Sequence, residues 1–520
     1  MINKIKNEIS ENKKYIYLSY LISILTIIPQ FVASPPLSSS KHIIFLSLAL
    51  IMLFFISKFS RLLFLVFIIY VNLSNIIIGH IFIHWGYDNV DIKPRIDVAM
   101  ISPNYESYEY LVSYVNYKDI LLIIYTIFVL LMLYKFITHF KHSFKIVKFL
   151  GFIFSIAIIM ATFFYKNPLI HLEPFSIPYK CISSTAYSEL FNLRAEYLNT
   201  LKPVPSTKKD KSIYDKVIVI QGEAANKHHM SVYGYDKNTT PFLSYLKSKD
   251  KLYIFNAIAP TNQTQYSIPL FFTKATVHNY KQAFIHSISL LSDFSHHNYE
   301  TYWISNQGKS GSTDTTVSSI ALEADISHFK NSFDYKAKPD EVILPYLDNI
   351  QDNQNKEMFV FHLMGSHSHY KNRYTKAISL FKNPINMVEE YDNTIYYTDN
   401  IIKHIVNRFK NKKVLIVYIS DHGEVVSDRI RSGRNGHGFL PPYKDEYDIP
   451  FVIYSSVKNT RINELYTNNK RGYFNLENLN YMIKYLSGIS NDNNISYSSD
   501  VFAVQPENIF DYNKLEFYKD

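Results

Sequence analysis

Residues that could bind a metal follow two short apolar runs of this sequence. Glu223 comes two residues after Lys216–Gln221, and Asp421 and His422 come directly after Lys413–Ser420. Carboxylates and an imidazole form an oxygen-and-nitrogen ligand set that suits zinc better than magnesium, which rarely binds imidazole. Each residue alone also fits a helix cap or a solvated surface charge. Their shared position after apolar runs predicts a metal site.

A metal with open positions needs a nucleophile, and one polar segment offers three hydroxyls. Thr261, Thr264 and Ser267 lie in Ala259–Pro269, just before an apolar run. A hydroxyl bound to zinc loses its proton more readily, because the cation stabilises the alkoxide. The same residue types are common helix N-caps. Both interpretations can hold for one residue, since a helix N-terminus stabilises an alkoxide and a bound phosphate.

Several histidines could contact an anionic group. His362, His367 and His369 gather near Arg373, and His437 lies in a glycine-rich segment further along. Cationic or donor side chains beside a metal suit a phosphoryl group, whose charge spreads over its oxygens. A single exposed histidine is equally consistent with ordinary polar surface.

The elements that must position these residues are strands alternating with helices. Isoleucines spaced along Asp392–Lys410 predict an amphipathic helix that leads into the last strand. Strand–helix alternation favours an α/β sheet covered on both faces, with chemistry beyond the carboxyl ends of the strands. The predicted strands are Lys216–Gln221, Thr301–Ser305, Met358–Met364 and Lys413–Ser420.

The first third of the chain is far more apolar than the rest. A membrane-spanning helix needs about 20 apolar residues, with some tolerance for shorter runs. Lysines and arginines concentrate before the first run and in alternate loops, which places the N-terminus in the cytoplasm. Five spans then export everything after Tyr165. The predicted spans are Tyr15–Ala33, His42–Ser57, Leu62–Ile83, Asp119–Tyr134 and Lys148–Tyr165.

We therefore predict three parts: a transmembrane domain over 1–165, a bridging linker over 166–212 and a catalytic domain over 213–520.

The 54 Lys and Arg residues exceed the 45 Asp and Glu residues by nine in 520 residues. So small an excess does not indicate a nucleic-acid-binding protein. A single cysteine, Cys181, excludes an intramolecular disulfide and a cysteine-based zinc cluster.

Taken in order, these motifs resemble the phosphoethanolamine transferases of Gram-negative inner membranes, within the alkaline-phosphatase/sulfatase-like superfamily. The resemblance covers the whole chain. The motifs that carry it are Gly222–Pro241, Thr264–Leu270, His362–His367 with Tyr370 and Arg373, Tyr391–Ile395, and Asp421–Glu424.

The resemblance implies a five-helix transmembrane bundle joined to a periplasmic α/β domain of alkaline-phosphatase/sulfatase-like fold. It implies one tightly bound zinc ion, leaves a second ion open, and makes Thr264 both a ligand and the nucleophile. The implied zinc ligands are Glu223, Thr264, Asp421 and His422. The implied substrate-binding residues are His362, His367 and His437, with Glu106 and Glu109 near the donor lipid.

The implied reaction takes phosphoethanolamine from phosphatidylethanolamine and releases diacylglycerol. The group passes through Thr264 to a lipopolysaccharide, at a core sugar or lipid A, or to another periplasmic glycan. We expect a monomer in the inner membrane that binds no nucleic acid. The alternatives are a phosphoglycerol transferase, a metal-dependent phosphodiesterase or other hydrolase, and a catalytically inactive scaffold or sensor.

The sequence departs from the family pattern in four places. Ala224 stands where Ser or Thr is usual, and Asn226 stands where Arg is expected. A basic insert, Arg429–Arg434, precedes His437. The disulfides common in the lipid A-modifying branch cannot form, which favours the branch that acts on core sugars or other glycans.

Overall fold

The structure is a computed structural model of the whole chain. Apart from isolated residues before 77, the residues that it describes are 115–139, 186–201, 212–308, 316–330, 338–349, 355–427 and 435–519, without 471, 493 and 494.

The chain divides into two compact units, and the larger one includes Thr185–Asp520. The smaller unit contains helix α7 (Tyr117–His139), whose stretch Tyr117–Lys135 is long and apolar enough to cross a membrane. This stretch contains the predicted span Asp119–Tyr134. The other four predicted spans lie almost wholly outside the described residues, as do Glu106 and Glu109, so the five-span arrangement stays a prediction.

The larger unit is built on a mixed sheet, in which eight of the described strands pair in the order β4-β3-β5-β1-β6-β7-β2-β8. Every pairing is parallel except those of β7 with β6 and with β2. The strands are β1 (Lys216–Gly222), β2 (Leu252–Ile258), β3 (Glu300–Ser305), β4 (Ile326–Phe329), β5 (Glu357–His362), β6 (Val414–Ser420), β7 (Asp448–Ser455), β8 (Phe474–Asn475), and a separate antiparallel pair, β9 (Asp500–Phe502) and β10 (Ile509–Asp511).

All four predicted strands are present, as β1, β3, β5 and β6. The central strand β1 is apolar on both faces because helices cover both faces of the sheet. Val217 and Val219 pack into one core cluster, whereas Ile218 and Ile220 pack into the other. Since β1 lies between β5 and β6, the residues that follow these three strands emerge at one edge of the sheet.

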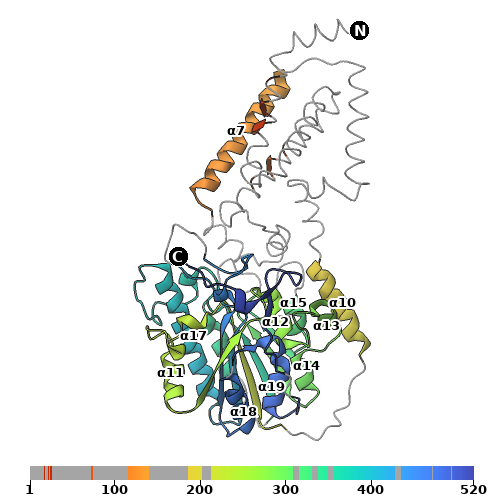
Figure 1. Ribbon diagram of the computed structural model, residues 1–520, viewed down its shortest axis with the longest axis vertical. Helices are drawn as coiled ribbons and strands as arrows, with labels where there is room; N and C mark the ends of the chain where they lie inside the picture. The colour runs from red at the N-terminus through yellow and green to blue at the C-terminus, as the bar shows by residue number, and fades with distance from the viewer. Residues whose placement is uncertain are drawn as a thin grey trace. The chain divides into compact units, whose positions relative to one another are not determined.

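Helices form a layer on each face, with α11 and α17 on one face and α12 to α15 on the other (Figure 1). The helices of this unit are α10 (Ala186–Thr200), α11 (Pro241–Ser248), α12 (Thr264–Phe272), α13 (Tyr280–Ile285), α14 (Leu290–Ser295), α15 (Thr316–Ala321), α16 (Leu344–Asn349), α17 (Met387–Phe409), α18 (Thr460–Asn469) and α19 (Leu479–Ser487).

The long helix α17 matches the amphipathic pattern predicted over Asp392–Lys410 and begins five residues earlier. Asn386 caps it, because its side chain accepts a hydrogen bond from the Glu389 N–H at 2.9 Å. Ile395, Ile402 and Phe409 are buried against the sheet. Helix α17 therefore stacks against the strands whose ends carry the candidate site.

Helix α12 contains an internal proline, and a neighbouring side chain compensates for it. Pro269 has no N–H, so the Gln265 carbonyl one turn earlier lacks its usual helical donor. The Thr316 hydroxyl donates to this carbonyl instead, at 2.6 Å. This bond ties the first turn of α12, which begins at Thr264, to α15.

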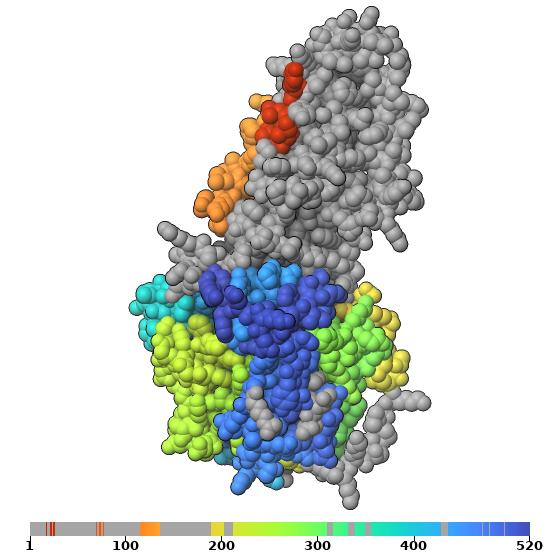
Figure 2. Space-filling view, viewed as in Figure 1, coloured from red at the N-terminus to blue at the C-terminus, as the bar shows by residue number. Residues whose placement is uncertain are grey.

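The final residues of the chain pack back onto the larger unit. The Tyr512 hydroxyl donates to Asp448 at 2.7 Å, and the Tyr518 N–H donates to Asp445 at 2.8 Å. Figure 2 shows this segment, in dark blue, at the surface of the domain. These bonds hold the segment that contains Tyr512 and Tyr518 against the start of β7 and the turn that precedes it.

Candidate active site

Three candidate metal ligands meet at the carboxyl ends of β1 and β6. Gly222 and Ser420 are register partners in these neighbouring strands, and Glu223, Asp421 and His422 follow them directly. His422 Nε2 lies 3.2 Å from Asp421 Oδ2 and 3.4 Å from Glu223 Oε1. All three side chains are buried. The two strands thus bring residues about 200 positions apart in the sequence into one cluster.

The hydrogen bonds of His422 and Asp421 leave one atom of each side chain, which could bind a metal, directed into this cluster. His422 Nδ1 donates to the Gly423 carbonyl at 2.8 Å, which leaves Nε2 toward the carboxylates. Asp421 Oδ1 accepts from the Ala224 N–H at 3.0 Å and from the His422 N–H at 2.8 Å. Asp421 Oδ2 accepts no hydrogen bond from the described residues, although it is buried. A buried carboxylate oxygen without a donor is what a metal ligand requires.

The pKa values of Glu223 and His422 also indicate that this cluster favours a bound positive charge. Burial, reinforced by the Asp421 charge, raises the pKa of Glu223 to about 8. Burial alone would lower the pKa of His422, but Asp421 and Glu223 outweigh it and raise this pKa to about 10. Two buried carboxylates therefore need a proton or a cation between them. The donor set fits a zinc ion held by Glu223, Asp421 and His422.

Thr264 is the candidate hydroxyl that reaches this cluster. It is the first residue of α12, and its Oγ1 lies 3.3 Å from His422 Nε2 and 3.4 Å from each Glu223 carboxylate oxygen. Ser267 instead donates to the Thr261 carbonyl at 3.4 Å, and the buried Thr261 hydroxyl has no partner among the described residues. The geometry therefore selects Thr264 from the three hydroxyls that the sequence left open.

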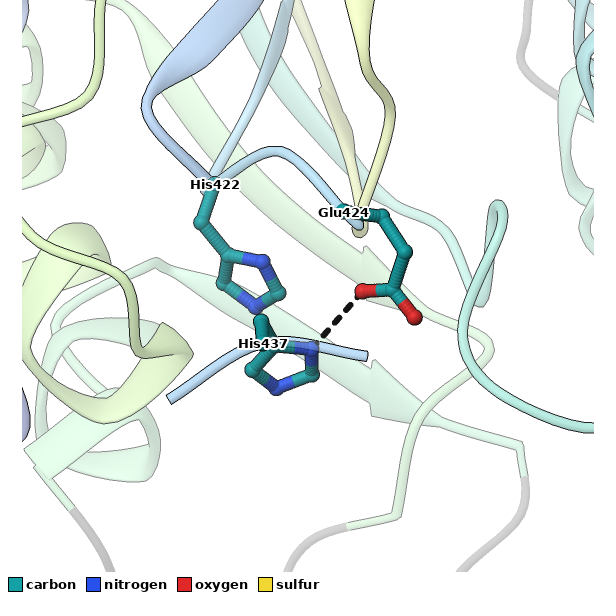
Figure 3. A group of neighbouring side chains, drawn as sticks. All are labelled: His422, Glu424 and His437. Atoms are coloured by element: carbon teal, nitrogen blue, oxygen red, sulfur yellow. Dashed lines mark hydrogen bonds and ion pairs between the residues drawn. The ribbon is translucent and has the colours of Figure 1, made fainter. Parts of the chain in front are cut away.

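A second group of donors adjoins the first and shares His422 with it (Figure 3). Glu424 Oε2 accepts from His437 Nδ1 at 2.8 Å, and Glu424 Oε1 accepts from the Tyr370 hydroxyl at 2.8 Å. The rings of His422 and His437 lie 3.8 Å apart, centroid to centroid. His422 Nδ1 is occupied by Gly423, so Nε2 is the nitrogen for which both groups compete. An ion at either group would therefore draw on the same nitrogen of His422.

Residues 215–479, just over half of the chain, match the protein-family model described as Sulfatase. The chain belongs to the sulfatase family. This match includes Glu223, Thr264, Asp421 and His422, so the cluster lies within the sulfatase domain.

Curated relatives of this member of the sulfatase family include transferases. The phosphoethanolamine transferase EptC of Escherichia coli K12 is 27% identical over 281 residues, which cover 50% of this chain and 48% of EptC. The protein YhbX of Escherichia coli O157:H7 is 27% identical over 366 residues, which cover 66% of this chain and 63% of YhbX. The chain thus spans from about half to less than two thirds of the length of these relatives.

Solved structures support the fold of this member of the sulfatase family. The periplasmic domain of Escherichia coli EptC, in complex with zinc, aligns with a TM-score of 0.51 at 23% identity, covering 61% of this chain and 98% of that domain. The integral membrane protein EptA of Neisseria meningitidis aligns with a TM-score of 0.56 at 16% identity, covering 91% of this chain and 95% of EptA. At these identities the likeness establishes the alkaline-phosphatase/sulfatase-like fold alone.

The predicted substrate-binding histidines of the sulfatase domain fall into different surroundings. His367 is half-buried, and burial together with Arg373, His437 and His422 lowers its pKa well below the usual value. His437 is also half-buried and is held by Glu424. His362 lies inside the sheet, 2% exposed, with Nδ1 3.1 Å from the Ser305 hydroxyl. His367 and His437 therefore border the cluster, whereas His362 packs beneath it.

The two departures nearest the cluster have structural roles. Ala224 adopts a left-handed backbone (φ 54°), and its carbonyl accepts from the Tyr391 hydroxyl at 2.7 Å. The Asn226 side chain donates to the Glu424 carbonyl at 3.1 Å, which links the segment after β1 to the segment after β6. At the position where the family pattern has a longer, positively charged arginine, the shorter, neutral Asn226 thus makes a hydrogen bond between the two segments.

The sequence analysis missed two side chains that support the site. Asp340 is buried and accepts from the Met364 and Gly365 N–H groups at 2.8 and 2.9 Å, which fixes the turn after β5. Gln307 donates to Glu223 Oε2 at 3.1 Å. Gln307 follows the predicted strand Thr301–Ser305 by two residues, so the strand-end rule that identified Glu223 could have found it. Asp340 follows no strand, and its role depends on tertiary contacts.

Proposed function

We propose that this chain is a zinc-dependent phosphoethanolamine transferase of the inner membrane, with its sulfatase domain in the periplasm. The donor is phosphatidylethanolamine, and the acceptor is a lipopolysaccharide or another periplasmic glycan. The observation that carries the proposal is the position of Thr264, whose hydroxyl lies within 3.4 Å of both Glu223 and His422 at the start of α12. The names of relatives such as EptC support the choice of transferred group.

Glu223, Asp421 and His422 would hold the zinc ion, which would lower the pKa of the Thr264 hydroxyl. In the first step Thr264 Oγ bonds to phosphorus, and the bond from phosphorus to the diacylglycerol oxygen breaks. The proton that Thr264 loses is matched by the one that diacylglycerol gains. In the second step an acceptor oxygen bonds to phosphorus, Thr264 leaves, and the acceptor proton restores its hydroxyl.

Residues around Thr264 suit an anionic group in both steps. Thr264 lies at the N-terminus of α12, where the helix dipole favours an anionic group. His367 and His437 border the cluster on its more exposed side and can donate to the same oxygens. A covalent intermediate suits a lipid donor and a glycan acceptor, because the two need not occupy the site together.

The proposal is tested with the purified full-length protein in vesicles that contain phosphatidylethanolamine, with and without lipopolysaccharide. We expect diacylglycerol and an acceptor that gains phosphoethanolamine, both lost in Thr264→Ala. Mass spectrometry of the acceptor separates the alternatives. An acceptor that gains phosphoglycerol from a phosphatidylglycerol donor would identify a phosphoglycerol transferase, and free phosphoethanolamine without a modified acceptor would identify a hydrolase. No diacylglycerol from any donor would refute enzymatic transfer.

A further inference from the structure

Gln307 contacts the carboxylate of Glu223 from outside the candidate ligand set. Its side-chain Nε2 donates to Glu223 Oε2 at 3.1 Å and to the Leu363 carbonyl at 2.9 Å. The Leu363 carbonyl can only accept, so the amide nitrogen must face it, and the second hydrogen of the same nitrogen is directed to Glu223 Oε2. The contact is therefore a directed pair of hydrogen bonds that joins the ends of β3, β5 and β1.

The surrounding backbone holds Gln307 in this position. The Ser305 hydroxyl accepts from the Gln307 N–H at 3.0 Å and donates to the Gln307 carbonyl at 3.1 Å, which closes a tight turn after β3. On the other side, the Leu363 N–H donates to the Gln221 carbonyl at 2.9 Å. The second acceptor of the Gln307 amide thus belongs to a segment that is itself bonded to β1.

These contacts make the two oxygens of Glu223 unequal. Oε2 accepts the Gln307 amide, whereas Oε1 lies 3.4 Å from His422 Nε2. The Thr264 hydroxyl is 3.4 Å from both oxygens, so it does not distinguish them. A carboxylate with one oxygen occupied by a neutral donor offers the other oxygen to a cation and is held from rotating.

We propose that Gln307 is a positioning residue for the metal site: its amide holds Glu223 Oε2 and reserves Oε1 for the cation. The inference rests on the proposed function, since it assumes that the cluster binds zinc. An amide suits this role because it donates to a carboxylate without adding a charge that would compete with the cation. A positioning residue of this kind typically changes metal affinity by 10- to 100-fold, as an order of magnitude.

The test is zinc affinity of the full-length protein, measured by competition with a chromogenic chelator after the metal has been removed. Gln307→Met keeps the length of the side chain but removes the hydrogen bonds, and we expect its zinc affinity to fall by about 10- to 100-fold. The thermal midpoint of the zinc-free protein should fall by a few degrees at most in Gln307→Met, the cost of two lost hydrogen bonds, so a tenfold or larger loss of zinc affinity in a protein that still folds separates positioning from a general structural role.

The matched control is Gln282→Met, the same change at an exposed position on α13, which should bind zinc like the parent protein. If Gln307→Met fails to fold, Gln307→Ala tests the same hydrogen bonds without a long apolar chain. Parent-like zinc affinity in the folded variant would overturn the role of Gln307 and leave the proposed function intact. A parent protein that binds no zinc would overturn both.

Discussion

The candidate site has two halves that are built differently. In the buried half, Glu223, Asp421 and His422 directly follow strands, and each is at most 1% exposed. In the open half, His367 and His437 lie on loops and are half-buried. Side chains at strand ends are fixed by the sheet, whereas loop residues meet solvent and can adjust. Under the proposed function, the buried half would hold a fixed ion and the open half would contact ligands that change during the reaction.

The largest effect is expected in the buried half. Asp421→Asn removes the charge of the oxygen that has no donor among the described residues while it keeps the shape of the side chain. We expect kcat/KM to fall about a thousandfold, equal to about 4 kcal/mol of transition-state stabilisation, together with loss of bound zinc. Activity assays and elemental analysis measure the two effects. The control is Asp293→Asn, which removes a carboxylate from the partly exposed ion pair with Lys484 and should leave both quantities unchanged.

A smaller effect is expected from Glu424, a buried residue that holds His437 of the open half. Glu424→Gln disturbs the hydrogen bond to His437 Nδ1 but leaves Glu223, Asp421 and Thr264 untouched. We expect kcat/KM to fall about 10- to 100-fold with the zinc content unchanged, because orientation of His437 is lost while the ion stays. Tyr370→Phe removes the other hydrogen bond to Glu424 and should have a weaker effect of the same kind. Loss of zinc from Glu424→Gln would contradict the division into two halves.

Gly365 tests how tightly the buried half is packed. It has a left-handed backbone (φ 49°), and a Cβ at this position would lie 2.7 Å from the Glu223 carbonyl oxygen. Gly365→Ala should therefore lower zinc affinity about tenfold by displacing Glu223, besides a backbone cost of about 1–3 kcal/mol. Gly234→Ala is the control, since it also has a positive φ but meets no atom within 4 Å. Equal zinc affinities in the two variants would show that the contact with Glu223 is unimportant.

The smallest effect is expected on the pH dependence of stability, from Asp448, which belongs to neither half of the site. Burial alone would raise the pKa of Asp448, but hydrogen bonds from His228 and Lys227 outweigh it and lower this pKa from 3.8 to about 2. A lowered pKa stabilises the folded state above the unfolded value, and this contribution is lost as the pH falls through the folded value. Between about pH 4 and pH 2 the protein should lose about 2 kcal/mol from this residue.

Thermal unfolding of the detergent-solubilised chain over this pH range measures the effect. Asp448→Asn should be less stable than the parent at neutral pH and should lose less stability on acidification. If the thermal midpoint of the variant falls as steeply with decreasing pH as that of the parent, other carboxylates cause the loss of stability.

The sequence predicted the buried half better than the open half, for a physical reason. Apolar runs such as Lys216–Gln221 mark strands, and the carboxyl ends of parallel strands share an edge, so Glu223 and Asp421 could be brought together without coordinates. The contacts of loop residues depend on tertiary structure. The predicted strand Met358–Met364 already separated His362 from His437, but residue type and spacing alone did not distinguish Thr264 from Thr261.

The most direct test of the central claim is intact-protein and peptide mass spectrometry after incubation with phosphatidylethanolamine in the absence of acceptor. The account predicts one phosphoethanolamine group on the peptide that contains Thr264, which disappears when lipopolysaccharide is added. Thr264→Ser should still form the adduct, because it keeps the hydroxyl. An adduct on any other residue, or continued transfer by Thr264→Ala, would contradict the assignment of Thr264 as the nucleophile.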